Sequence, residues 1–247
     1  MEIIIDGKKC EAQYGEYLLD IARKNGIHIP TLCHSDALPG QATCRLCIVE
    51  VVEGSRRRVV TSCVFPVTRE VEVFTNSEKI RRMRKNIIRL LSARAPKNEF
   101  IQKLREEYGL LQETRFAVDE KENCILCGLC VRACEEMGIF AISTVNRGIE
   151  KKVSTPFDEA SDVCIGCGAC AFVCPTRAIN IMDENGVRHL WNKEFQLVKC
   201  QKCGEYFTTR EHQEYMKQKF GEDNNYTLCE KCRKKAAGEK MAECYRI

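Results

Sequence analysis

Hydrophobic and polar residues alternate along the first part of the chain in a pattern that predicts short strands around a single helix. A strand over residues 1–6 is followed by Asp6-Gly7, a pair typical of hairpin turns, and residues 9–13 can return as its partner. Apolar residues at helical spacing then predict a helix that ends near Gly26. A second hairpin around Glu53-Gly54 and an alternating strand at 70–74 complete a β-rich region.

The apolar period changes to that of a helix over residues 77–93 and again over residues 98–109. The residues expected on the inner faces are Ile80, Met83, Ile87 and Leu91 in the first helix, and Ile101, Leu104 and Tyr108 in the second. The first helix also carries a basic run made of Arg81, Arg82, Arg84, Lys85 and Arg89. This run could form a docking face for an acidic partner, but a solvated helix face is the simpler interpretation.

Charged residues make up 30% of the 247 residues, so we expect several small modules rather than one large apolar core. The same charges interrupt every apolar run, and no membrane span is predicted. The chain contains 18 cysteines, yet its start lacks the features of a secretory signal peptide. We therefore expect a cytoplasmic protein whose cysteines bind metal. The net charge of +4 does not indicate a partner, because bound clusters change the charge balance.

The first of four cysteine groups lies in the β-rich region, which together with its helix is typical of a β-grasp ferredoxin domain. It has the spacing C-x10-C-x2-C-x15-C and consists of Cys33, Cys44, Cys47 and Cys63. A long loop lets four thiolates converge from irregular backbone whose N–H groups can point at sulfur, as a [2Fe–2S] cluster requires. The alternative is four buried free cysteines, which a CxxC pair in a loop disfavours.

The second and third groups both have the spacing C-x2-C-x2-C-x3-C, which is typical of ferredoxins with two [4Fe–4S] clusters. Each motif is expected to give three thiolates to one cluster and its fourth cysteine to the other. The predicted sets are Cys124, Cys127, Cys130 with Cys174, and Cys164, Cys167, Cys170 with Cys134. Glycines 128, 166 and 168 would let the backbone approach the clusters closely. Two zinc sites would not need this crossed arrangement.

The fourth group consists of two CxxC pairs, Cys200 with Cys203 and Cys229 with Cys232. Four thiolates in this spacing suit one tetrahedral ion, either zinc or a single iron. Zinc is preferred because only Cys203 is followed by the glycine that iron sites of this type usually have after both pairs. A capping box at Thr208 and Glu211 predicts a helix that runs to Gly221 between the pairs. Cys10, Cys244 and the four histidines, His34 among them, are not expected to bind metal.

The spacing of the first group resembles the amino-terminal domain of the large iron–sulfur subunit of respiratory complex I. Soluble relatives of that subunit include the diaphorase subunits of NAD-linked hydrogenases and electron-bifurcating flavoprotein complexes. In this family, helices after the ferredoxin domain carry one histidine and three cysteines for a further four-iron cluster. Here Ala95 and Glu99 stand where the histidine and the first cysteine are expected, and residues 75–123 contain neither residue type. The resemblance therefore implies a helical segment that has lost its cluster.

The sequence thus predicts an α+β chain of four parts. These are a β-grasp [2Fe–2S] domain at 1–75, a helical segment at 76–115, a 2x[4Fe–4S] ferredoxin-like domain at 116–183, and a four-cysteine zinc module with a tail at 184–247. The sequence has neither a G-x-G-x-x-G motif after a strand nor a P-loop, so flavin and nicotinamide chemistry is expected on partner subunits. We predict an electron-transfer subunit of an NAD(P)-linked flavoprotein complex, with a ferredoxin as one potential partner.

Three alternative functions remain at this stage. The first is an iron–sulfur subunit of a succinate dehydrogenase or fumarate reductase, which joins similar domains but has a shorter first gap in its two-iron loop. The second is a subunit of a hydrogenase complex. The third is a nucleic-acid-binding zinc protein, which the paired CxxC motifs allow but which the lack of aromatic interleaving and of a basic tail disfavours.

Overall fold

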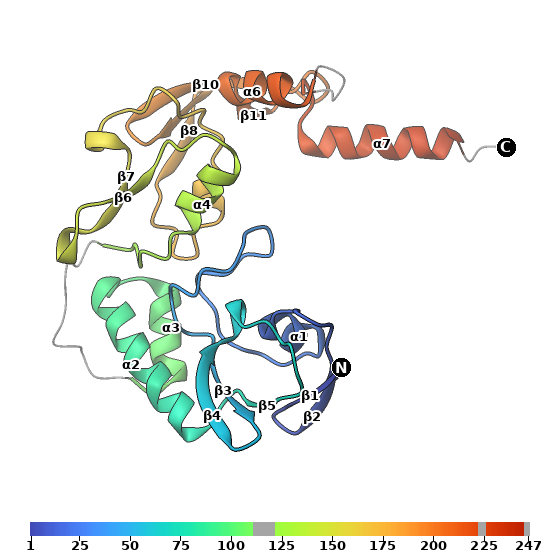
Figure 1. Cartoon of the computed structure of the whole chain (residues 1–247). Helices are drawn as coiled ribbons and strands as arrows, with labels where there is room; N and C mark the ends of the chain where they lie inside the picture. The colour runs from blue at the N-terminus through green and yellow to red at the C-terminus, as the bar shows by residue number, and fades with distance from the viewer. Residues whose placement is uncertain (111–121, 222–225, 245–247) are drawn as a thin grey trace.

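The computed structural model describes residues 1–110, 122–221 and 226–244. Figure 1 shows two lobes, a lower one formed by residues 1–110 and an upper one formed by residues 122–221, with a C-terminal helix that projects from the upper lobe. Helices are combined with sheets in which all but one pairing is antiparallel, so the predicted α+β class is confirmed for the described residues. The predicted boundary between residues 115 and 116 lies outside the described residues.

The lower lobe is built on a five-stranded sheet with strand order β2-β1-β5-β3-β4, in which only β1 and β5 are parallel. Leu18, Leu19 and Ile21 of the helix pack against Ile3 and Ile5 of the sheet, and all five side chains are buried. Both predicted hairpins, the helix and the last strand are confirmed. The elements are β1 (Glu2–Ile5), β2 (Lys8–Glu11), α1 (Leu18–Lys24), β3 (Ile48–Glu53), β4 (Arg56–Thr61), the 3-10 turn η1 (Ser62–Val64) and β5 (Glu72–Phe74).

Two helices, α2 (Glu78–Arg94) and α3 (Glu99–Glu107), complete the lower lobe. The predicted inner face of α3 is confirmed, because Ile101, Leu104 and Tyr108 are buried. The predicted face of α2 is partly wrong. Its buried residues are Ile80, Arg84, Ile88, Ser92 and Ala93, whereas Met83 is 37% exposed. The physical reason is Arg84, whose guanidinium donates to two buried carbonyl groups. The face of α2 that carries Arg84 is therefore buried although it contains polar residues.

The upper lobe begins with two short helices that pack against each other, α4 and α5. Each helix starts at a glycine with left-handed backbone, Gly128 and Gly168, both at a φ of 77°. A two-stranded ribbon lies between them in sequence. The elements are α4 (Leu129–Glu136), β6 (Ser143–Val145), η2 (Gly148–Glu150), β7 (Lys152–Ser154), η3 (Pro156–Asp158) and α5 (Ala169–Phe172).

A four-stranded antiparallel sheet with strand order β11-β10-β9-β8 follows, and two helices end the described chain. The predicted boundary between residues 183 and 184 falls inside β8, which pairs with β9. Phe195 of β10 is fully buried in one core with Cys164 and Cys170, so this sheet packs on the ferredoxin-like region. The elements are β8 (Ile181–Glu184), β9 (Val187–Leu190), β10 (Lys193–Lys199), β11 (Tyr206–Thr209), α6 (Arg210–Phe220) and α7 (Glu230–Cys244).

The start of α6 differs from the prediction by one residue. Thr209, rather than Thr208, accepts the capping hydrogen bond from the His212 backbone N–H, while the Thr208 hydroxyl pairs with the His212 ring. The predicted end at Gly221 is confirmed. Helix α7 buries none of its residues. Within the described ranges, no helix has the length and hydrophobicity needed to cross a membrane.

Candidate metal centres

The four cysteines of the first group come together as two pairs of thiols in the loop region beside β3. All four are buried, with exposed fractions between 1% and 7%. The sulfur atoms of Cys47 and Cys63 lie 3.3 Å apart, and the Cys33 and Cys44 thiols also share a hydrogen bond. In a [2Fe–2S] cluster each iron takes two thiolates. The pairing in the structure therefore fits a two-iron cluster, with one pair for each iron.

Each pair stabilises one thiolate. The hydrogen bond from the Cys44 thiol lowers the pKa of Cys33 to about 6, even though burial opposes this shift. The hydrogen bond with Cys63 lowers the pKa of Cys47 to about 6 in the same way. The Cys44 backbone N–H also donates to the Cys33 sulfur at 3.3 Å. The same hydrogen bonds, together with burial, raise the pKa of Cys44 and of Cys63, so each pair contains one stabilised thiolate, which is the form that binds metal.

Two residues that the sequence analysis missed shape this loop. A Cβ atom at Gly40 would lie 2.5 Å from the Cys63 carbonyl oxygen, so only glycine fits beside the 3-10 turn η1 that carries Cys63. Arg84 of α2 is 2% exposed and donates from Nε to the Leu46 carbonyl at 2.9 Å and from Nη2 to the Ile48 carbonyl at 2.7 Å. These two bonds hold the chain on either side of Cys47. The turn pair Pro39-Gly40 could have indicated the first position, but nothing in the sequence indicated the second.

The second and third groups lie on the loops that lead into α4 and α5 and on these helices, with Cys130 and Cys134 in α4, Cys170 in α5 and Cys174 just after α5. Burial raises the pKa of the Cys127 thiol to about 11, and the nearby charge of Cys174 adds to the increase. Burial also raises the pKa of Cys164 and Cys167, and the nearby Cys134 contributes to both shifts. The structure therefore brings the fourth cysteine of each motif close to the other motif. This proximity supports the predicted crossed ligand sets, which remain a prediction.

Several N–H groups point at these sulfur atoms. Backbone N–H groups donate to Cys124 at 3.4 Å, to Cys134 at 3.2 Å and to Cys174 at 3.3 Å. The indole N–H of Trp191 donates to Cys170 at 3.4 Å. Hydrogen bonds of this kind stabilise negative charge on cysteine sulfur and are one way in which a protein sets the potential of a cluster. The sequence analysis did not identify Trp191, which lies 21 residues from Cys170 in the chain.

Gly166 shows why the third group needs glycine. Its φ is +64°, and a Cβ atom there would lie 2.7 Å from the ring of the fully buried Phe195. A side chain at this position would therefore be strained and would collide with the core of the C-terminal sheet. The close neighbour at Gly166 is the Phe195 ring, and the predicted approach of this backbone to a cluster stays a prediction.

Ala95 and Glu99 stand at the two positions where the resemblance implied a histidine and a cysteine ligand. Ala95 is fully buried in an apolar core, and Glu99 lies exposed in the first turn of α3. Asn98, between them, caps α3 with its side-chain oxygen and donates from Nδ2 to the Thr176 carbonyl at 2.8 Å. At the positions where the resemblance implied ligands, the described chain has apolar packing and a hydrogen bond to the ferredoxin-like region.

The fourth group forms one compact set. The sulfur atoms of Cys200, Cys203, Cys229 and Cys232 all lie within 4.8 Å of one another. Burial opposes ionisation of Cys200, but the backbone N–H groups of Cys229, Cys203 and Lys202 outweigh it and lower the pKa of Cys200 to about 6. Cys203 is exposed and Cys232 is half-buried. A single tetrahedral ion fits this set, and the thiol distances do not distinguish zinc from iron.

The remaining candidates are two cysteines and His34, which directly follows Cys33 in the chain. Cys10 is buried in β2, and Cys244 is exposed at the end of α7. The His34 ring shares a hydrogen bond with the Arg23 guanidinium at 3.2 Å.

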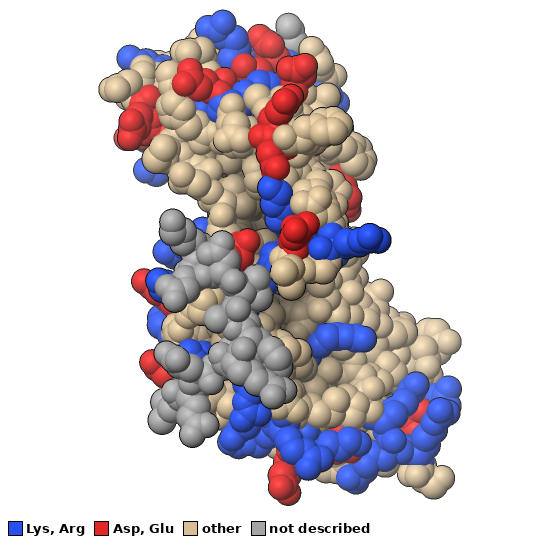
Figure 2. Space-filling view, turned by 90° about the vertical axis from the view of Figure 1, so that its left-hand side faces the viewer, with Lys and Arg blue, Asp and Glu red and all other residues tan. Residues whose placement is uncertain are grey.

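The predicted basic face of α2 is incomplete. Arg81, Arg82 and Arg89 are exposed, but Arg84 is buried and contacts the cluster loop instead of solvent. Figure 2 shows Lys and Arg side chains gathered at the lower end of the molecule, where α2 and the β3–β4 hairpin lie in Figure 1. Arg57 of that hairpin is exposed as well. The basic surface therefore includes this hairpin as well as α2.

Comparisons with known proteins agree with this geometry. Residues 1–78 match a family described as "2Fe-2S iron-sulfur cluster binding domain", and residues 117–182 match a "4Fe-4S dicluster domain". The chain is similar to NADP-reducing hydrogenase subunit HndD of Solidesulfovibrio fructosivorans, with 33% identity over 72% of this chain and 36% of the relative. It is also similar to an NADH-quinone oxidoreductase subunit of Rhizobium meliloti, with 30% identity over 83% of this chain and 27% of the relative.

A solved structure of an NAD+-reducing [NiFe]-hydrogenase in the H2-reduced state is also similar, with a TM-score of 0.54 and 26% identity. The match covers 62% of this chain and 74% of the hydrogenase chain. The chain spans only about a third of the length of the two sequence relatives named above. The chain is thus an iron–sulfur protein related to the large iron–sulfur subunit of complex I and to subunits of NAD(P)-linked hydrogenases.

Proposed function

We propose that this chain relays electrons within an NAD(P)-linked oxidoreductase complex, between a flavin-containing subunit and a second redox site or a ferredoxin. The observation that carries this proposal is the continuity of the buried thiol sites. One apolar core contains Cys33 and Cys44 of the first group together with Cys127 of the second. The next core contains Cys130 together with Cys164 and Cys170 of the third group. Neighbouring sites therefore share packing, as a chain of redox centres requires.

The first two sites also approach each other through their loops. A Cβ atom at Gly128 would lie 3.5 Å from the side-chain oxygen of Gln41, which belongs to the loop between Cys33 and Cys44. When bound, iron–sulfur clusters supply one-electron redox chemistry. The residues of this chain supply the thiolates, the N–H groups that stabilise their charge, and the close packing that excludes water from the path between them.

The nicotinamide and flavin chemistry is assigned to partner subunits. The sequence lacks a dinucleotide-binding glycine motif, and the relatives named above are subunits of NAD(P)-linked enzymes. Those relatives favour this proposal over a succinate dehydrogenase-like subunit. The C-terminal four-cysteine site is proposed to hold one structural zinc, because a closed four-thiolate set has no open position for chemistry. Electron bifurcation by the complex remains a prediction from the resemblance.

The proposal is tested by purifying the chain with and without its native partners in the absence of oxygen. The isolated chain should contain about ten iron atoms, from one [2Fe–2S] and two [4Fe–4S] clusters, and about one zinc. It should not oxidise NADH or NADPH with artificial dyes, whereas the complex should, and flavin should be found in the partner chains. Turnover by the isolated chain, or a preparation that cannot hold redox-active clusters, would contradict the proposal.

A further inference from the structure

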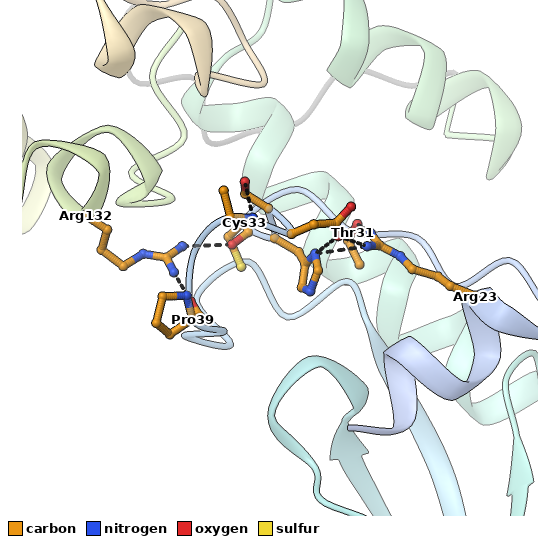
Figure 3. Close-up of polar contacts among 9 residues, drawn as sticks. Arg23, Thr31, Cys33, Pro39 and Arg132 are labelled. Atoms are coloured by element: carbon orange, nitrogen blue, oxygen red, sulfur yellow. Dashed lines mark hydrogen bonds and ion pairs between the residues drawn. The ribbon is translucent and has the colours of Figure 1, made fainter. Parts of the chain in front are cut away.

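An arginine beside the second cysteine group extends out of its own domain. Arg132 lies on α4 between Cys130 and Cys134 and is 6% exposed. Its Nη2 atom donates to the Cys33 carbonyl oxygen at 3.0 Å, and its Nη1 atom donates to the Pro39 carbonyl oxygen. Figure 3 shows the guanidinium reaching from α4 to the loop that carries both acceptors. A single side chain thus connects the helix of one cluster domain to the ligand loop of the other.

The charge of this arginine lacks the usual compensation. Its hydrogen-bond acceptors are both carbonyl groups, and its buried Nε atom has no hydrogen-bond partner among the described residues. A buried guanidinium costs free energy unless negative charge or good acceptors lie nearby. The neighbouring cysteines, Cys33 on one side and Cys130 and Cys134 on the other, are the groups that would carry negative charge with clusters bound.

We propose that Arg132 is a positioning residue that fixes the Cys33–Cys44 loop against α4 and raises the reduction potential of the [2Fe–2S] cluster held by that loop. This inference rests on the proposed electron relay, in which that loop holds a [2Fe–2S] cluster. Reduction adds one electron, and therefore one negative charge, to the cluster. A fixed positive charge beside Cys33 stabilises the reduced form more than the oxidised form, and no proton is needed for this effect.

Arg23 of α1, which contacts the same loop, provides a matched control. Its guanidinium lies on the other side of Cys33 in Figure 3 and donates to the Asp36 carboxylate at 2.7 Å. It also contacts the His34 ring at 3.2 Å. Its side chain is 39% exposed and its charge is balanced by Asp36, so it should affect the cluster little. Replacing Arg23 therefore removes a positive charge that contacts the same loop, without breaking the connection to α4.

The experiment compares the full chain with the variants Arg132→Gln, Arg132→Lys and Arg23→Gln. The midpoint potential of the [2Fe–2S] cluster is measured by paramagnetic resonance during redox titration. Relaxation enhancement of its signal by the neighbouring reduced [4Fe–4S] cluster reports the contact between the domains. Arg132→Gln should shift the reduction equilibrium at least tenfold towards the oxidised form, which equals about 59 mV for one electron, and should weaken the enhancement.

Arg132→Lys separates charge from geometry. The midpoint potential of the [2Fe–2S] cluster in this variant should stay close to the wild-type value, because the positive charge is kept. The relaxation enhancement should be weaker, because a single ammonium group lacks the fork geometry with which arginine reaches both carbonyls. Arg23→Gln should leave both measurements unchanged. The inference is overturned if Arg132→Gln matches Arg23→Gln, or, where Arg132→Gln fails to assemble clusters, if Arg132→Lys keeps the wild-type enhancement. Absence of a [2Fe–2S] signal from the wild-type chain would instead contradict the proposed function.

Discussion

The first and the fourth cysteine groups each consist of four thiols, but the two groups lie in different surroundings. Cys33, Cys44, Cys47 and Cys63 are all buried and form two pairs, and Cys33 and Cys44 lie in one core with Cys127 of the second group. The C-terminal four form one set within 4.8 Å, and two of them are exposed or half-buried. Helices α6 and α7 beside that set bury none of their residues. The first site therefore lies in the protein core, whereas the C-terminal site lies beside two helices that bury none of their residues.

The difference indicates what each site contributes. Arg84 and Arg132 fix the backbone around the first group, so a change there affects the neighbouring cluster domain. The C-terminal module contacts the ferredoxin-like region instead, for example through the hydrogen bonds from the Tyr215 hydroxyl to the Met137 carbonyl and from the Thr209 hydroxyl to the Ile165 carbonyl. A redox centre must be held at a fixed distance from its neighbours, while a structural ion needs only to close a local fold.

The largest expected effect comes from removing a ligand of the first group. Cys47→Ser should eliminate the [2Fe–2S] signal and about two of the iron atoms, because serine is a poor ligand for this cluster. The matched control is Cys10→Ser, which replaces a buried cysteine of β2 that belongs to no thiol group and should keep all the iron. Iron analysis and paramagnetic resonance measure both outcomes. Full iron content in Cys47→Ser would show that Cys47 is not a ligand.

The corresponding change in the C-terminal set should have a local effect. Cys229→Ser should lose about one zinc and the exchange protection of residues 226–244, since zinc binding contributes about 10–16 kcal/mol to folding in zinc-finger peptides. Protection of residues 1–110 and the iron content should not change. Cys244→Ser, at the exposed end of α7, is the control. Mass spectrometry after hydrogen exchange measures protection, and loss of an iron-type visible spectrum would show that the site holds iron.

The sequence was sufficient where local patterns determine the structure. The turn pair Asp6-Gly7, with φ values of 47° and 82°, is a local signal, and the hairpin around it was predicted correctly. The α2 face was predicted wrongly because Arg84 is buried by partners 36 and 38 residues away in the chain. Arg132 was missed for the same reason, since its acceptors lie 93 and 99 residues away. Buried cations that bond to carbonyl groups carry no local sequence signal.

A smaller effect is expected from the arginine that supports the first group. Arg84→Met keeps the length and apolar character of the side chain but leaves the Leu46 and Ile48 carbonyls without this donor. We expect the free energy of opening at β3 to fall by about 2–4 kcal/mol, measured by native-state hydrogen exchange. Arg82→Met, on the exposed face of the same helix, should change it by less than about 0.5 kcal/mol. Equal effects of the two variants would mean that Arg84 does not support the loop.

The smallest effect is expected from a hydrogen bond between the C-terminal region and a cysteine of the third group. Trp191 follows β9 and donates its indole N–H to the Cys170 sulfur at 3.4 Å. Trp191→Phe keeps an aromatic ring but removes this donor, so the reduced cluster on Cys170 loses more stabilisation than the oxidised cluster. Its potential should fall by less than about 59 mV, which is a tenfold change in the one-electron equilibrium. The cluster on Cys124, measured in the same titration, is the internal control. An unchanged or increased potential at Cys170 would show that the C-terminal sheet does not influence the relay through this bond.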